Sequence, residues 1–112
     1  MKLSIRKEKN VVVLDAEGKI VLGDGDVEIK SAVDDLIAKG NKNIILNLAK
    51  VDYVDSAGLG EMMRCFITLR KAGGDFKLLS PNRRIIDLLS ITKLLNVFDV
   101  YDSESSAIKS YS

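Results

Sequence analysis

The stretch NIILNLAKVDYVDSAGLGEMM, residues 43–63, joins an apolar run to a segment with helical periodicity. Residues 43–48 form a short continuous apolar run, which is typical of a strand buried on both faces of a parallel sheet. After Asp55 and Ser56, apolar side chains recur about every 3.6 residues, as they do on one face of a helix. A glycine pair, Gly73 and Gly74, is expected to end this helix. The expected buried face of the helix consists of Leu59, Met62, Met63, Phe66 and either Leu69 or Arg70.

The segments before this stretch predict a hairpin and a helix. Residues 3–6 and 11–16 are rich in β-forming side chains and are separated by a polar turn, a pattern typical of an antiparallel hairpin. Apolar residues then follow at helical spacing. We expect Asp24 or Asp26 to cap the start of that helix and Gly40 to follow its end. The core-facing residues of the helix are predicted to be Ile29, Ala32, Val33, Leu36 and Ile37.

The segments after the opening stretch predict further strands and helices. Residues 75–80 indicate a strand, and Pro81 suits the first turn of the helix that follows it. Residues 92–96 are loosely helical, residues 97–101 predict a short strand, and residues 103–111 are amphipathic. The helix after Pro81 is expected to carry the apolar residues Ile85, Ile86, Leu88 and Leu89.

Strands that alternate with helices indicate an α/β fold with right-handed crossovers. We expect a mixed sheet of roughly four to five strands, in which an opening antiparallel hairpin precedes parallel strands, covered by about four helices. Residues 1–112 are expected to form a single domain, since a chain of this length matches the commonest domain size.

The composition excludes several classes of protein. Hydrophobic residues make up 46% and charged residues 29% of the chain, which is typical of a globular domain and not of a disordered one. The formal charge of +1 gives no electrostatic case for direct binding of nucleic acid. The chain contains no histidine, which excludes His-based triads, imidazole zinc sites and phosphohistidine relays. Cys65 is the only cysteine, so no intramolecular disulfide or two-cysteine metal site can form.

The cellular location follows from two further features of the sequence. No apolar run is long enough for a membrane helix, so no membrane partner is expected. The charged, alternating residues 1–10 do not have the pattern of a signal peptide. We therefore expect a cytoplasmic protein.

The predicted topology places several segments at one edge of the sheet. If the second hairpin strand and the next two strands are parallel, the segments that follow them meet at their carboxyl edge. These segments are residues 21–26, 51–58 and 80–83. Open α/β sheets place their sites at such an edge. Ser56 is therefore a candidate site residue whose neighbours can form a surface with it.

Two interpretations of Ser56 follow from local chemistry. Either Asp55 or Ser56 begins the second helix, where backbone N–H groups lack acceptors, so either side chain could simply cap it. The alternative is a functional hydroxyl. Gly58 and Gly60 favour this alternative, because glycine in a helix costs about 1 kcal/mol relative to alanine and needs a reason, such as close approach by another molecule. A phosphate on Ser56 would carry about −1.5 to −2 charges, which the helix N-terminus would tolerate.

These residues carry a family resemblance. NIILNL and VDYVDSAGLG, followed by an amphipathic helix, Gly-Gly, a strand and SPNRRIIDLLSITKLLNVF, resemble the STAS domains, specifically the bacterial anti-sigma-factor antagonists. The resemblance covers residues 2–108, and the Asp-Ser-x-Gly-Leu-Gly core is its most specific motif. It implies a non-enzymatic protein whose Ser56 is phosphorylated by a partner that is both an anti-sigma factor and a serine kinase. The unmodified form would bind that partner and release the sigma factor; a PP2C-type phosphatase would restore this form after phosphorylation.

The resemblance also implies a partner surface. Many antagonists carry a Gly-acid-apolar-Asp stretch after the second strand, whereas residues 18–21 here are Gly-Lys-Ile-Val. The protein therefore uses Asp24 and Asp26 instead or presents a differently charged interface, and helix capping by these two acids is the favoured interpretation. No nucleotide, other cofactor or metal is expected on this chain. The expected partner-binding residues are Asp24, Asp26, Asp55, Ser56, Ala57, Gly58, Leu59, Gly60, Ser80 and Asn82.

Three other functions fit parts of the pattern. A non-switching STAS scaffold would bind its partner equally well with alanine in place of the serine. A receiver-type phosphoacceptor would use Asp52 and Asp55 with a lysine and magnesium, but receiver acids cluster near the first strand, where Asp15 stands alone. A phosphate-binding loop is a weak match, because the turn lacks the glycine spacing and the Lys-Ser/Thr ending of a P-loop. The exposed part of the Met62 and Met63 face could serve a homodimer.

Overall fold

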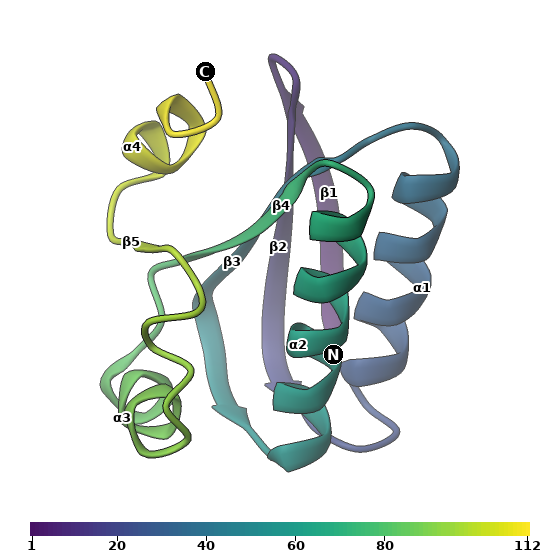
Figure 1. Ribbon diagram of the computed structural model, residues 1–112. Coiled ribbons are helices and arrows are strands. Elements are labelled where there is room, and N and C mark those ends of the chain that lie inside the picture. Colours follow the sequence, from purple (N-terminus) through teal and green to yellow (C-terminus); the bar gives the residue numbers. More distant parts are fainter.

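An antiparallel hairpin opens a mixed sheet, and parallel strands continue it (Figure 1). The computed structural model describes residues 1–112 and orders the strands β1-β2-β3-β4-β5. Only β1 and β2 are antiparallel, so the predicted fold class is confirmed. The strands are β1 (Lys2–Glu8), β2 (Val11–Ile20), β3 (Asn43–Val54), β4 (Asp75–Leu79) and β5 (Val100–Tyr101). The helices are α1 (Asp26–Ala38), α2 (Ser56–Lys71), α3 (Arg83–Ile91) and α4 (Glu104–Lys109).

Both faces of the central strands are covered. Helices α1 and α2 lie side by side on one face (Figure 1). Val12 and Leu14 of β2 belong to the large core beneath these helices, whereas Val11 and Val13 belong to a smaller cluster beneath α4. This alternation follows from the period of two in a strand. The apolar run at residues 43–48 is divided between the same two clusters, which confirms its predicted burial on both faces.

Helix α2 presents its apolar stripe to the large core, as its periodicity predicted. The sequence left open whether Leu69 or Arg70 belongs to the buried face of this helix. Leu69 is buried and Arg70 is exposed, so the residue on the buried face is Leu69. Met62 is fully buried and Met63 is half-buried, so Met62 cannot contribute to the homodimer surface suggested for this face. The buried residues of α2 are Gly58, Leu59, Met62, Cys65 and Leu69.

Strand β3 is longer than the sequence pattern indicated. Residues 51–54 were expected in a loop, but they continue the strand and pair with β2 as far as Val54, which lies opposite Ile20. The backbone finds a partner because β2 itself extends to Ile20 through two register shifts. Val51 and Val54 are buried, so the extension still contributes to the core.

Helix α3 begins after Asn82, and Pro81 lies before its cap instead of in its first turn. The Asn82 side-chain oxygen accepts a hydrogen bond from the N–H of Ile85 at 2.9 Å. Its amide nitrogen donates to the carbonyls of Val51 at 3.1 Å and Asp52 at 3.3 Å. Asn82 therefore fastens α3 to the extension of β3. This role within the fold was not included in its prediction as a partner-binding residue.

The remainder of the chain differs in detail from the prediction. Residues 92–96 form turns instead of helix, and the last strand covers only Val100–Tyr101 because only these residues reach the edge of β4. Helix α4 is capped by Ser103, as the Ser-led amphipathic pattern indicated. In α3, Ile85 and Leu89 are buried, and Ile86 and Leu88 are half-buried.

Two polar contacts hold α4 on the sheet. The Arg6 guanidinium on β1 binds Asp15 of β2 and Glu104 of α4, each at 2.6 Å. The ammonium of the buried Lys77 lies 4.2 Å from the centre of the Tyr111 ring, and the Tyr111 hydroxyl donates to backbone carbonyls of β3 and β4. The C-terminal segment is thereby attached to β1, β3 and β4, on the face of the sheet away from Ser56.

Candidate functional site

The start of α2 is organised by Asp55. One oxygen of its carboxylate accepts a hydrogen bond from the N–H of Gly58 at 2.8 Å, which is the geometry of an N-cap. The other oxygen accepts from the N–H of Leu22 at 3.1 Å. Hydrogen bonds from Gly58 and Leu22 hold the pKa of Asp55 below its usual range, because they favour the charged form. Asp55 is therefore the cap, and it also fastens the β2–α1 loop beside α2.

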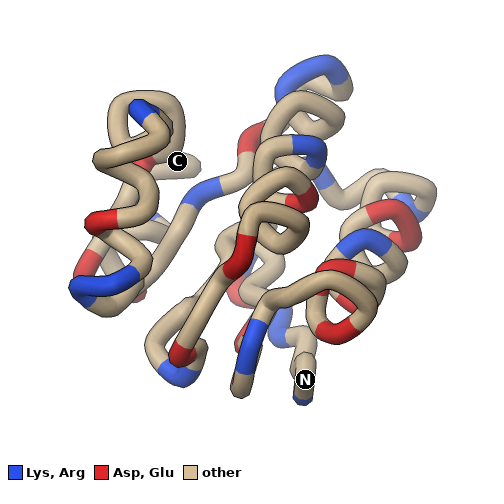
Figure 2. Tube along the Cα trace, turned by 90° about the horizontal axis from the view of Figure 1, so that it is seen from below, with Lys and Arg blue, Asp and Glu red and all other residues tan.

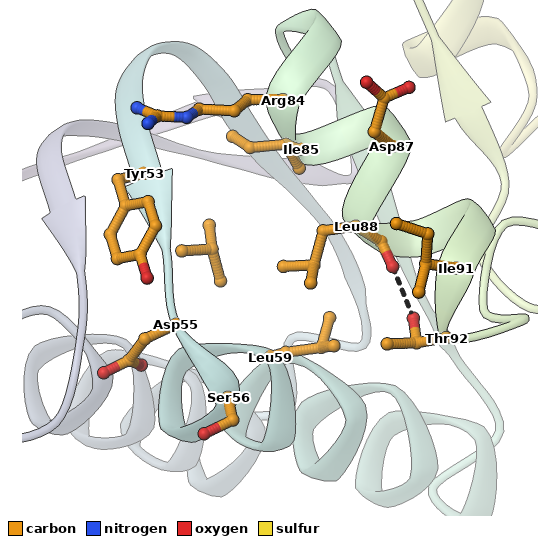
Figure 3. Close-up of a pocket in the computed structure, with 11 residues that line it drawn as sticks. Tyr53, Asp55, Ser56, Leu59, Arg84, Ile85, Asp87, Leu88, Ile91 and Thr92 are labelled. Atoms are coloured by element: carbon orange, nitrogen blue, oxygen red, sulfur yellow. Dashed lines mark hydrogen bonds between the residues drawn. The ribbon is translucent and has the colours of Figure 1, made fainter.

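The side chain of Ser56 does not cap the helix. It is the first residue of α2, its side chain is exposed, and its hydroxyl forms no hydrogen bond within the chain. Figure 3 shows the hydroxyl pointing outward, away from the side chains of Leu59 and Leu88. The sequence left open whether Ser56 is a helix cap or a functional hydroxyl. Because Asp55 caps the helix, Ser56 offers an accessible hydroxyl at a helix N-terminus.

The two glycines of the motif differ in their surroundings. Gly58 is buried, and a Cβ at this position would overlap the backbone carbonyl of Ile20. The close approach that requires this glycine is therefore made by β2 and not by another molecule, which corrects the prediction. A Cβ on Gly60 would meet no atom within 4 Å, and this residue is exposed. Ala57 is half-buried and Leu59 is 8% exposed, so the accessible part of the motif is centred on Ser56 and Gly60.

Neither Asp24 nor Asp26 caps α1, contrary to the prediction. Gly25 occupies the N-cap position with φ 95°, a left-handed conformation that glycine adopts readily, and a Cβ there would overlap the backbone of β2. The Glu28 carboxylate accepts a hydrogen bond from the Gly25 N–H at 3.1 Å. Asp24 instead binds the amino group of Met1 at 2.6 Å, and Asp26 is the first helical residue. Their loop lies beside Ser56 because Asp55 holds it there.

Residues 21–26, 51–58 and 80–83 were expected to meet at the carboxyl edge of the sheet, and this prediction is only partly correct. Strands β2 and β3 end together, but β4 ends at Leu79, opposite Asn47, and β3 continues seven residues further to Val54. At roughly 3.3 Å per residue, the end of β4 lies about 20 Å short of the end of β3. Ser80 therefore does not lie beside Ser56; its N–H donates to a backbone carbonyl of β5 at 2.7 Å.

An apolar groove lies between the start of α2, the end of β3 and α3 (Figure 3). It encloses about 340 Å³, and Ser56 stands at its lip. Sequence reasoning missed this groove, because it depends on the unexpected extension of β3 beneath α3. The available signal was the spacing of Leu88 and Ile91 on one side of α3. The lining residues are Tyr53, Val54, Asp55, Ser56, Leu59, Arg84, Ile85, Asp87, Leu88, Ile91 and Thr92.

Charged side chains are dispersed around this site and over the rest of the molecule. Figure 2 shows basic and acidic positions interspersed along the helices and loops. No group of three or more Cys, Asp or Glu side chains is placed to hold a metal ion. No helix has both the length and the apolar character needed to cross a membrane.

The molecule is thus a small α/β domain with an exposed serine beside an apolar groove. The family model described as the STAS domain matches residues 2–107, and the chain belongs to this family. The resemblance found in the sequence is thereby confirmed. STAS domains of the antagonist type are non-enzymatic binding proteins, and this chain is one of their relatives.

Individual relatives cover nearly the full length of the chain. A Thermotoga neapolitana protein named as a candidate anti-sigma factor antagonist is 32% identical over 101 residues, spanning 90% of this chain and 89% of the relative. The anti-sigma-B factor antagonist of Bacillus subtilis is 28% identical over 98 residues, spanning 88% of each chain. The crystal structure of a candidate antagonist from Thermotoga maritima superposes with a TM-score of 0.91 at 28% identity, covering 97% of this chain and 93% of that one.

Proposed function

We propose that this domain is an anti-sigma-factor antagonist whose binding is switched by phosphorylation of Ser56. In this proposal the unmodified domain sequesters an anti-sigma factor that is also a serine kinase, and the sigma factor is released to direct transcription in the cytoplasm. The observation that carries the proposal is the division of roles at the start of α2. Asp55 makes the cap, so the hydroxyl of Ser56 is exposed and unbonded. The family relationship supports the general role.

The domain contributes an acceptor to the proposed reaction. The Ser56 oxygen attacks the γ-phosphorus of a nucleotide held by the kinase, the bond between that phosphorus and the bridging oxygen breaks, and the serine proton passes to a base of the kinase. Magnesium and nucleotide belong to the kinase. A PP2C-type phosphatase hydrolyses the phosphoserine and returns the hydroxyl.

A phosphate on Ser56 is compatible with the fold of the domain but opposes its complex with the kinase. It adds about −1.5 to −2 charges at the N-terminus of α2, where the helix dipole and free N–H groups favour an anion. The same charges stand next to the ionised Asp55 and would be desolvated beneath a bound partner. Phosphorylation therefore opposes binding by local repulsion and desolvation, without refolding of the domain.

The test uses protein purified from its native cells and its kinase partner. Peptide mass spectrometry should find phosphate on Ser56. Ser56→Ala should bind the partner like the unphosphorylated wild type, whereas Ser56→Asp should bind at least about tenfold more weakly, equivalent to roughly 1.4 kcal/mol. Ser31→Asp, at an exposed serine of α1, is the matched control and should bind normally.

Two results together would overturn the switch. These are the absence of phosphate on Ser56 under every growth condition and unchanged partner binding by Ser56→Asp. That outcome would instead indicate a non-switching scaffold, in which the motif serves the fold and the partner binds constitutively.

A further inference from the structure

The groove beside Ser56 leaves large apolar side chains in contact with solvent. Ile91, the last residue of α3, is 80% exposed, and Tyr53 on β3 is 41% exposed. Leu59 and Leu88 form an apolar floor between them (Figure 3), and Val54 also lines the groove. Exposed apolar surface that forms one continuous hollow is typical of a binding site for another molecule, in contrast to apolar residues scattered singly.

Several polar groups around the groove are engaged within the chain. Arg83 binds Asp87 at 3.0 Å, and the Arg84 guanidinium lies 5.5 Å from the centre of the Tyr53 ring. The hydroxyl of Thr92 donates to a backbone carbonyl within α3 at 2.7 Å. The two oxygens of the Asp55 carboxylate accept backbone N–H groups, as described above. Arg84 is the only cation that lines the groove, and it lies over the Tyr53 ring at the rim; the floor itself carries no charged group, so it suits an apolar side chain.

The position of Ser56 selects the occupant. Ser56 is one of the residues that line the groove, and its hydroxyl stands at the edge of the apolar floor. A kinase that brings a nucleotide to this hydroxyl would therefore lie next to the groove. A protein surface that covers an exposed apolar hollow gains most by filling it, because well-packed apolar anchors at the centre of an interface dominate its affinity.

We propose that the groove between α2 and α3 receives an apolar side-chain anchor of the same anti-sigma factor kinase, and that this anchor supplies docking affinity separately from the phosphorylated hydroxyl. This inference rests on the proposed function of Ser56. It adds α3, and Ile91 in particular, to a partner surface that the sequence placed around the motif, the β2–α1 loop, Ser80 and Asn82. The anchor binds the unmodified domain, and a phosphate at the lip then weakens the complex from its edge.

The experiment compares Ile91→Ser with Ile67→Ser. Both residues are exposed isoleucines in helices, but Ile67 lies on α2 outside the groove. Calorimetric titration with the purified kinase should show that Ile91→Ser weakens binding by about tenfold or more, a factor that corresponds to 1.4 kcal/mol. In phosphorylation assays the same variant should raise KM by a similar factor and leave kcat unchanged, since the acceptor is intact. Ile67→Ser should match the wild type in both assays.

Each outcome distinguishes the groove from the switch. Normal affinity and KM for Ile91→Ser, with a wild type that is bound and phosphorylated, would overturn the groove as a docking site and leave the switch in place. A wild type that is neither bound nor phosphorylated would overturn both proposals. Self-association of the domain that Ile91→Ser abolishes, measured by analytical ultracentrifugation without kinase, would assign the groove to a second copy and also overturn this proposal.

Discussion

The carboxylate of Asp55 accepts the backbone N–H of Leu22 at 3.1 Å, across a separation of 33 residues in the chain. The residue next to Ser56 thus determines where the β2–α1 loop lies, in addition to capping α2. Because one side chain performs both tasks, the loop and the serine form a single pre-arranged surface. This contact also explains why an acid precedes the serine, since a carboxylate has two oxygens and can accept from both directions.

Substitution of Asp55 should lower the stability of the domain according to how many of its two hydrogen bonds are lost. Asp55→Ala removes both hydrogen bonds and should lower the melting temperature, whereas Asp55→Asn retains one acceptor oxygen and should lower it less. Asp52→Asn provides the control, since Asp52 is exposed and its side chain forms no hydrogen bond. Thermal unfolding by circular dichroism measures the effect. Equal melting temperatures for Asp55→Ala and the wild type would show that the cap is unimportant.

The two glycines of the motif should respond in opposite directions to alanine. Gly58→Ala places a methyl group against the carbonyl of Ile20 and should destabilise the domain by about 1–3 kcal/mol. Gly60→Ala adds a methyl group in open space and should stabilise it by up to about 1 kcal/mol, because alanine is the better helix former. Urea denaturation measures both. If both variants were destabilised equally, the different packing of the two glycines would not matter.

The parts of the fold that follow from local periodicity could be predicted from the sequence. Helix α2 is the clearest case, because its apolar stripe and its glycine terminator lie within one short segment. Ser56 was also found in this way, since helix N-termini have recognisable residue preferences. The choice between Asp55 and Ser56 as the cap was beyond local chemistry, because both residue types cap helices well.

The features that depend on distant partners could not be predicted. Strand β3 extends to Val54 because β2 offers a partner as far as Ile20, and the local signal of the register shifts that allow this pairing is limited to Gly18 within β2. The need for glycine at position 58 likewise comes from Ile20, which lies 38 residues earlier in the chain. The groove depends on the extension of β3, because Tyr53 and Val54 line it together with residues of α2 and α3.

The ion pair between Arg6 and Asp15 should make stability depend on pH in the acid range. The hydrogen bond from Arg6 is the main cause of the lowered pKa of Asp15, with help from Asn47 and the charge of Lys50. A lowered pKa in the folded state means that the contribution is fully present above the unfolded value of about 3.9 and is lost as the pH falls through the folded value. Asp15→Asn should therefore cost about 1 kcal/mol at pH 7 and less at pH near 2, by urea denaturation at both pH values.

Asp102→Asn is the control for this prediction, because Asp102 is exposed and forms no ion pair. It should follow the wild type at both pH values. A cost of Asp15→Asn that is the same at acid and neutral pH would assign the effect to packing and not to the charge of the carboxylate.

The last prediction concerns the attachment of α4. The Tyr111 hydroxyl donates to the carbonyls of Ile44 at 2.6 Å and Asp75 at 2.9 Å, and burial is the main reason that its pKa is raised. Tyr111→Phe removes this donor from a half-buried residue and leaves the two carbonyls without it, so it should destabilise the domain by about 1–3 kcal/mol. Tyr101→Phe is the matched control, since the Tyr101 hydroxyl forms no hydrogen bond. Hydrogen exchange should show faster opening of α4 in Tyr111→Phe alone. Because α4 lies on the face of the sheet away from Ser56, binding to the kinase should remain unchanged, and a loss of binding would show that α4 and the Ser56 surface are coupled.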